Sequence, residues 1–193
     1  MTTNRLEAFS DGVIAILITI MVLELKMPEG ATSWSAIRDS GLLLKLLTYV
    51  LSYLILGIYW SNHHHLFHVV PHVNGRILWA NLHLLFWLSL VPFTTAWVGS
   101  SHNAKIPTAI YAMVFLCSAQ AWDLLNRQII KLHGTDSTLA VLIGRDRKGL
   151  ISRVLYVAAV GAAFVYPWIS DALISAVGLM WLMPDRRIER APH

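Results

Sequence analysis

The chain has 193 residues, of which 56% are hydrophobic and only 13% charged, with a mean hydropathy of +0.57. About a quarter of the residues of a soluble domain are charged, so this composition excludes a soluble globular protein and indicates an integral membrane protein of the all-α class. The net charge of +4 is spread over loops, which argues against nucleic acid as a partner, and the single Cys117 excludes an internal disulfide framework.

The first predicted membrane helix covers residues 6–25. At about 1.5 Å per residue it is about 30 Å long, the thickness of the hydrocarbon core of a bilayer. Its entrance carries four polar side chains: Arg5, Glu7, Ser10 and Asp11. Ionisable groups at membrane depth are costly and mark functional positions. The rest of this segment is apolar apart from Thr19 until Glu24.

Later apolar stretches predict five more membrane helices. Pro92 predicts a kink near Leu88. Pro167 divides a last stretch that would be about 51 Å long as a single helix, which is too long to span once. We therefore expect one six-helix transmembrane domain, residues 1–193. The approximate spans are 6–25, 42–68, 77–98, 108–130, 150–166 and 168–183.

Loop charges predict the orientation. If the N-terminus is cytoplasmic, eleven of the fifteen lysines and arginines fall on the cytoplasmic side and four on the other. By the positive-inside rule, both termini are expected in the cytoplasm. The eleven are Arg5, Arg76, Arg127, Lys131, Arg145, Arg147, Lys148, Arg153, Arg186, Arg187 and Arg190, and the four are Lys26, Arg38, Lys45 and Lys105.

One face of the first span carries branched apolar residues and a single hydroxyl. At about 100° per residue, its members fall on the same side of the helix. These residues are Gly12, Ile16, Thr19, Ile20 and Leu23. Periodicity alone leaves two readings open, because such a stripe serves helix packing more often than it lines a pore.

A histidine cluster lies near the end of the second span. His64 and His68 are four residues apart on one helical face, a spacing that suits a metal pair. A zinc hydrolase also needs an acid or base, and no acidic residue lies between Asp39 and Asp123. The alternative is that these histidines hydrogen-bond between helices. We favour the second interpretation, with no resident metal or cofactor, and keep a His-rich membrane metalloenzyme as an alternative.

Three motifs resemble one family. Arg5-x-x-x-Phe9-Ser10-Asp11 is similar to the RxxxFSD signature of the transmembrane protein 175 family, whose animal member is a potassium channel of endosomes and lysosomes. Two further segments are similar to the pattern of that family: Trp60-x-x-His63-His64 and Pro92-Phe93-x-Thr95. By motif, the resemblance covers residues 5–95.

The resemblance implies a function and an assembly. Prokaryotic members are single six-helix repeats that form homotetramers, in which the first helix of each copy lines a central cation pathway. The large residues that constrict this pathway correspond here to Ile16, then Thr19 and Ile20, then Leu23. The implied protein is a potassium-preferring channel, not an enzyme, in the plasma membrane of a prokaryote, with the lipid bilayer and potassium ions as partners.

A mechanism follows from these residues. The chain has no TVGYG-like loop, so we expect a hydrophobic constriction at Ile16 and a selectivity contribution from the Thr19 hydroxyl. A weakly selective cation or proton leak is the alternative. We also expect a polar network that fixes the first helix against its neighbours, and which of His63, His64 and His65 joins it stays open. The residues assigned to this network are Arg5, Phe9, Ser10, Asp11, Trp60, His64 and His83.

Overall fold

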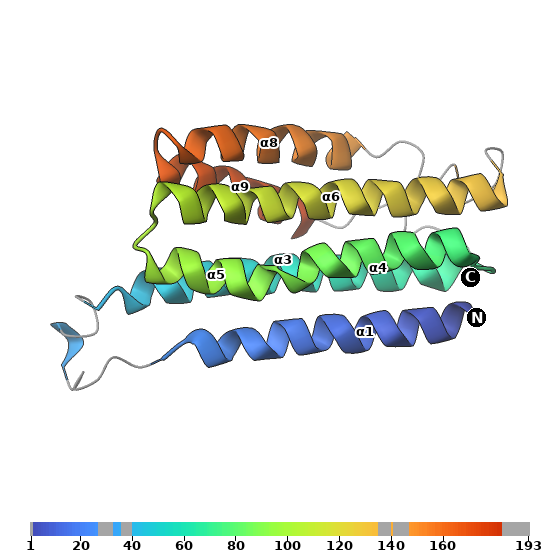
Figure 1. Cartoon of the computed structure of the whole chain (residues 1–193), viewed down its shortest axis with the longest axis horizontal. Coiled ribbons are helices and arrows are strands. Elements are labelled where there is room, and N and C mark those ends of the chain that lie inside the picture. The colour runs from blue at the N-terminus through green and yellow to red at the C-terminus, as the bar shows by residue number, and fades with distance from the viewer. Residues whose placement is uncertain (1, 27–32, 36–39, 135–139, 141–146, 183–193) are drawn as a thin grey trace.

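The computed structural model describes residues 2–26, 33–35, 40–134, 140 and 147–182. Over these ranges the regular elements are all helices, which confirms the expected all-α class, and successive long helices run antiparallel along one bundle axis (Figure 1). The helices are α1 (Thr3–Ile20), prolonged by a 3₁₀ turn (Met21–Glu24), then α3 (Leu42–Val69), α4 (Gly75–Ser89), α5 (Val91–Ser100), α6 (Lys105–His133), α8 (Arg147–Ala163) and α9 (Pro167–Leu182).

Four helical segments of the described chain are long and apolar enough to cross a membrane. They are Thr3–Glu24, Leu42–Val69, Gly75–Ser100 and Lys105–His133. The apolar helix α9 is shorter, with 16 residues, and α8 has 17. The protein is therefore a multi-pass membrane protein, whereas the count of six spans and the single domain stay predictions.

The two proline positions interrupt the helices as expected. Pro92 has no amide hydrogen and cannot donate to the carbonyl of Leu88, four residues before it. The chain accordingly breaks at Leu90, between α4 and α5, so the kink predicted near Leu88 is confirmed. Pro167 begins α9 after the turn that ends α8 at Ala163. The last apolar stretch is thus two antiparallel helices (Figure 1).

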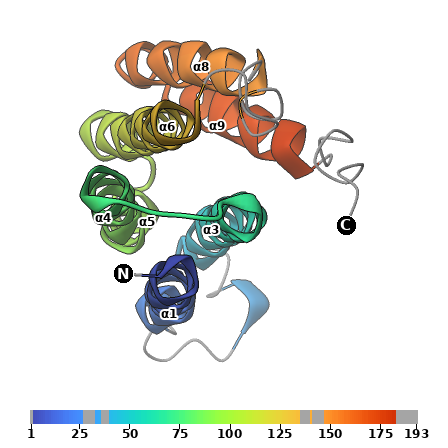
Figure 2. The ribbon, with the colours of Figure 1, turned by 90° about the vertical axis from the view of Figure 1, so that its right-hand side faces the viewer.

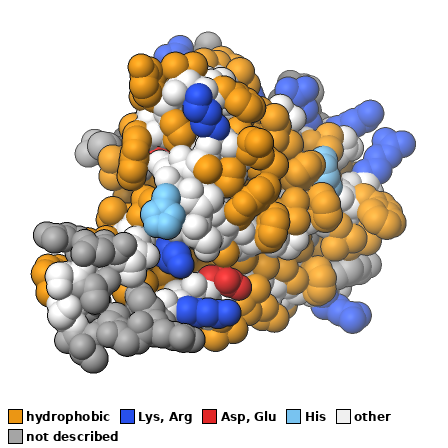
Figure 3. All heavy atoms as spheres, turned by 60° about the vertical axis from the view of Figure 1, so that its left-hand side comes forward, with side chains coloured by type: hydrophobic (Ala, Val, Ile, Leu, Met, Phe, Trp, Pro, Cys, Tyr) orange, Lys and Arg blue, Asp and Glu red, His pale blue; other side chains and the backbone are white. Residues whose placement is uncertain are grey.

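Helix α1 lies at one edge of the bundle. Viewed end-on, it sits beside α3 and the α4–α5 pair, while α8 lies beyond α6 and α9 lies beside α6, in contact with α3 (Figure 2). Its buried residues, Leu6, Ser10, Ile14 and Leu17, recur every three or four positions and form one face. Exposed large hydrophobic side chains occur on all the long helices, and they predominate over charged groups on the face shown in Figure 3, as a lipid environment requires.

A buried hydroxyl cluster joins the middle of three helices. Ser52 of α3 lies 2.7 Å from the Thr95 hydroxyl of α5 and 2.8 Å from the Tyr111 hydroxyl of α6. Thr95 also donates to the carbonyl of Val91 at 2.7 Å. Because no water competes for these groups in a bilayer, such contacts hold neighbouring helices in register.

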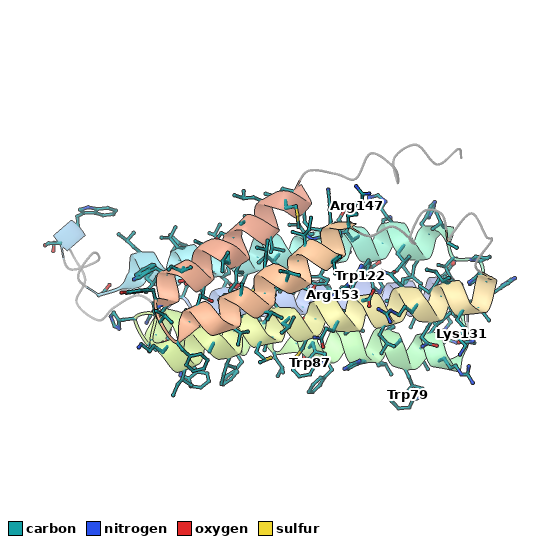
Figure 4. All side chains as sticks on the ribbon, turned by 90° about the horizontal axis from the view of Figure 1, so that it is seen from above. Trp79, Trp87, Trp122, Lys131, Arg147 and Arg153 are labelled. Atoms are coloured by element: carbon teal, nitrogen blue, oxygen red, sulfur yellow. The ribbon has the colours of Figure 1, made fainter. Side chains whose placement is uncertain are left out.

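Basic residues gather toward one end of the bundle. Lys131 and Arg147 lie toward the end at which the N-terminus sits, whereas Trp79 projects outward from α4 (Figures 1 and 4). Arg153 contacts Asp123 of α6 at 3.4 Å. Several positions used in the orientation and span predictions lie outside the described residues: 183, Arg38, Arg145, Arg186, Arg187 and Arg190.

Close approach of α5 to α3 gives the first testable prediction. A Cβ atom at Gly99 would lie 3.2 Å from the Cα atom of Lys45, whereas one at Gly161 would meet nothing within 4 Å. Overpacking costs about 1–3 kcal/mol, so Gly99→Leu is expected to lower the melting temperature of the detergent-solubilised protein. Gly161→Leu, in an exposed stretch of α8, is the control. Equal melting temperatures for the two variants would contradict this packing.

Candidate functional site

Helix α1 presents two faces with different surroundings. The face with Leu6, Ser10 and Ile14 is fully buried against the rest of the chain. On the other face the exposed fractions are 59% for Ile16, 41% for Ile20 and 70% for Leu23. The stripe singled out in the sequence is therefore not packed within the described part of the chain.

Thr19 lies on the exposed face and has its hydroxyl oriented by the helix itself. The Oγ1 atom is 3.0 Å from the carbonyl oxygens of both Ala15 and Ile16, to which it donates. Since the hydroxyl hydrogen is used within the helix, the oxygen lone pairs are left for a group outside α1. This geometry suits the binding of a cation.

A chain of hydrogen bonds links three helices through fully buried side chains. His63 Nε2 of α3 lies 2.8 Å from Asn81 Oδ1 of α4, and Asn81 Nδ2 donates to Ser10 Oγ of α1 at 2.8 Å. The Ser10 hydroxyl donates in turn to the carbonyl of Leu6 at 2.9 Å. Because Asn81 Oδ1 can only accept, His63 carries its hydrogen on Nε2.

A second contact crosses between α1 and α3 one turn away. Glu7 Oε1 lies 2.8 Å from His64 Nδ1, and the ring of Trp60 stacks on His64 with centroids 6.2 Å apart. The Thr3 hydroxyl adds a third tie by donating to the carbonyl of Pro71 at 3.3 Å. The first two turns of α1 are therefore fixed by polar contacts, in contrast to the apolar turns that follow.

Three residues assigned to this network lie elsewhere. Arg5 is exposed, Phe9 is 50% exposed, and His83 is exposed and accepts a hydrogen bond from Trp87 Nε1 at 2.8 Å. In the described chain, His83 therefore lies with Trp87 on the exposed side of α4, away from the buried amide of Asn81. His83 follows Asn81 by two positions, which places it about 200° around α4 from the buried amide.

Two residues that carry the network were not assigned to it. Asn81 is its centre, and Glu7 is the partner of His64. The signal available in the sequence was an amide within an apolar span, since an unpaired amide in hydrocarbon is costly. His63, one of three open alternatives, is the histidine that reaches Asn81, whereas His64 faces Glu7.

One group of described residues has the ligand types of a metal site. Atoms of Glu7, Asp11 and His64 all lie within 4.8 Å of one another. His68 stacks on His64 with centroids 6.1 Å apart, but it does not belong to this group. The pair expected from spacing alone, His64 with His68, thus differs from the cluster that the fold assembles.

Comparison with known proteins places these features in a family. A family model described as the endosomal/lysosomal potassium channel TMEM175 matches residues 5–92. A potassium channel of Chryseobacterium sp. (strain P1-3) is 51% identical over 191 residues, which cover 99% of this chain and 98% of that protein. A protein of Danio rerio described as the endosomal/lysosomal proton channel TMEM175 is 26% identical over 69% of this chain and 25% of its own length.

A solved structure agrees over nearly the whole chain. The crystal structure of a lysosomal potassium-selective channel TMEM175 homolog from Chamaesiphon minutus superposes with a TM-score of 0.73 at 28% identity, and the match covers 94% of this chain and 96% of that one. With the high identity to the Chryseobacterium protein over both full lengths, this agreement leads to one conclusion: the chain belongs to the TMEM175 family of membrane channels.

Proposed function

We propose that the protein is a potassium-preferring cation channel whose pore is lined by α1 from four copies of the chain. The observation that carries the proposal is the exposed apolar face of α1, with Ile16 at 59% and Leu23 at 70% exposure. The names of its bacterial relatives, which are potassium channels, support the choice of ion.

Assembly of several copies follows from the position of α1. A pore needs walls on all sides, and in the described part of the chain α1 lies at one edge of the bundle with one uncovered face. The match to the Danio rerio relative covers about a quarter of the length of that protein. Four copies with α1 innermost would place the Ile16 side chains around a common axis, and the homotetramer is part of this proposal.

The constriction is assigned to Ile16. A ring of branched apolar side chains excludes water when it is narrow, so ions cross only after the helices spread or turn. Ile20 and Leu23 extend the apolar lining by one and two turns. This lining carries no fixed charge, and we propose no resident cofactor and no enzymatic activity for a member of a channel family.

Selectivity is assigned to Thr19. Four hydroxyl oxygens, oriented by their bonds to the carbonyls of Ala15 and Ile16, would replace part of the hydration shell of a cation. Potassium is the less tightly hydrated of the two common monovalent cations, so it would pass more readily than sodium. The animal relatives are named proton channels, which keeps a proton or weakly selective cation leak as the second candidate.

The polar contacts of Ser10 and Glu7 serve as the anchor of α1 in this mechanism. They bind the first turns of the helix to α3 and α4, while the pore-lining turns have no such contact on their exposed face. Basic residues at the same end of the bundle, including Lys131 and Arg147, favour a cytoplasmic location for that end. We therefore place both termini on the cytoplasmic side of a prokaryotic plasma membrane.

Replacement of the constriction tests the pore. Ile16→Asn places an amide ring in the apolar constriction and is expected to increase potassium flux into liposomes, about tenfold for each 1.4 kcal/mol removed from the barrier. Val22→Asn is the control, because Val22 is 50% exposed on another side of the same helix. Unchanged flux in Ile16→Asn, or an equal increase in both variants, would contradict the assignment of the constriction to Ile16.

Selectivity has its own test at Thr19. Thr19→Val keeps the shape of the side chain but removes the oxygen, so the ratio of potassium to sodium permeability is expected to fall toward one. Thr19→Ser retains the hydroxyl and is expected to keep most of the discrimination. Reversal potentials under bi-ionic conditions measure both ratios. A valine variant that discriminates as well as the wild type would contradict a role for the hydroxyl.

The anchor is tested at Asn81. Asn81→Ala leaves His63 Nε2 and Ser10 without their buried partner, and an unsatisfied buried polar group costs about 1–3 kcal/mol. We expect a lower melting temperature and a smaller fraction of assembled tetramer. Tryptophan fluorescence measures the melting temperature. His83→Ala removes an exposed polar residue from the same helix and is expected to have little effect. If both variants lose melting temperature and tetramer to the same extent, the buried hydrogen bonds of Asn81 do not anchor α1.

A further inference from the structure

Two carboxylates and one imidazole cluster beside the polar contacts that anchor α1. Neither the anchor nor the proposed pore requires this combination of residues. Glu7 and Asp11 are one turn apart on α1, and His64 faces them from α3, the neighbouring helix in the end-on view (Figure 2). Each residue offers one ligand atom, and these atoms lie within 4.8 Å of one another. The three side chains are neither fully exposed nor fully buried within the chain.

The charges of this cluster are unbalanced. Two carboxylates face a single imidazole, which contributes at most one positive charge. Glu7 is paired with His64 at 2.8 Å, whereas the Oδ1 atom of Asp11 is buried and has no hydrogen-bond partner among the described residues. An unpaired carboxylate oxygen in such surroundings is costly. A bound cation would supply both the missing charge and the missing partner.

We propose that Glu7, Asp11 and His64 form a binding site for a divalent transition-metal ion of the Zn²⁺ type. Carboxylate oxygens and an imidazole nitrogen bind Zn²⁺ at about 2.0–2.2 Å, so donor atoms on one tetrahedral ion are about 3.3–3.6 Å apart. The present separations, between 2.8 Å and 4.8 Å, bracket this value. Small side-chain rotations are enough to close the site around an ion, with water as the fourth ligand.

The ligand set also selects among cations. Mg²⁺ and Ca²⁺ prefer oxygen ligands and larger coordination numbers, whereas an imidazole favours zinc and its neighbours in the first transition row. The imidazole ligand therefore makes the site prefer a transition-metal ion to Mg²⁺, the divalent cation that is abundant in cytoplasm. It takes a transition metal as a regulatory ligand rather than as a cofactor of conduction.

The position of the site gives the ion a consequence for the channel. The ligands come from α1 and α3, so a bound ion ties the two helices together near the start of α1. Five positions at about 100° per residue put Asp11 about 140° around the helix from Ile16, so the ion does not lie in the pore lining. This step rests on the proposed function: a tied α1 moves less, and the metal inhibits conduction.

Direct binding tests the site without any flux measurement. Purified, metal-free full-length protein is titrated with Co²⁺, whose visible absorption reports coordination, and then with Zn²⁺ as competitor. One Co²⁺ per chain is expected, displaced by Zn²⁺. Glu7→Gln is expected to weaken binding by about tenfold or more. His68→Gln is the matched control, because His68 stacks on His64 but lies outside the cluster.

The binding outcomes are decisive in both directions. Absence of Co²⁺ absorption in the wild type would overturn the site, as would wild-type affinity in Glu7→Gln. A loss of affinity in His68→Gln as large as that in Glu7→Gln would assign the metal to the His64–His68 pair instead. Weakened binding in Glu7→Gln with unchanged binding in His68→Gln supports the cluster.

Flux measurements test the regulatory step separately. Potassium flux in liposomes is recorded with Zn²⁺ or Mg²⁺, and each protein is compared with its own metal-free flux. Zn²⁺ is expected to inhibit the wild type and His68→Gln, whereas Glu7→Gln needs about tenfold more Zn²⁺ and Mg²⁺ inhibits none of them. Binding without inhibition would overturn the regulatory step alone. Absence of flux in every sample would overturn the proposed function. The metal site would then be tested by the Co²⁺ titration alone.

Discussion

The hydrogen-bond chain from Ser10 through Asn81 to His63 determines how α1 sits in the bundle. Lipid offers no hydrogen bonds, so a polar side chain at membrane depth must find its partner on another helix. Each member of this chain is fully buried, and each comes from a different helix. Rotation or translation of α1 would separate Ser10 from Asn81, and the buried face of the helix is therefore set by polar groups as much as by packing.

Helix α1 has a division of tasks along its length. Its first turns hold the polar contacts to α3 and α4, including the Glu7–His64 pair. From Gly12 to Leu23 the side chains are apolar apart from Thr19. The polar contacts of α1 are thus concentrated at one end of the helix, whereas the exposed stripe lies toward the other end. A metal bound by Glu7, Asp11 and His64 would strengthen the fixed end, which is why it would act on the movement of the other end from outside the pore.

The elements were predictable because their causes are local. Hydropathy and length identify the long helices, and the missing amide hydrogen of proline accounts for the breaks near Pro92 and Pro167. The partners of each polar residue were not predictable in the same way. His63 and His64 differ by about 100° on α3, and Asn81 and His83 by about 200° on α4. The choice between them depends on how each helix is rotated in the bundle, which neither helix encodes alone.

Charged residues at membrane depth commonly mark the path of an ion, but here they are used differently. Glu7 and Asp11 face α3, and the exposed side of α1 carries Ile16, Thr19 and Leu23. A pathway lined by these residues has no fixed charge with which to attract or repel an ion at its narrowest point. In the proposed pore, discrimination would depend on the cost of removing water from the ion, offset in part by the Thr19 oxygen. Since this cost is lower for potassium than for sodium, partial replacement of the hydration shell by the Thr19 oxygen would favour potassium in the proposed pore.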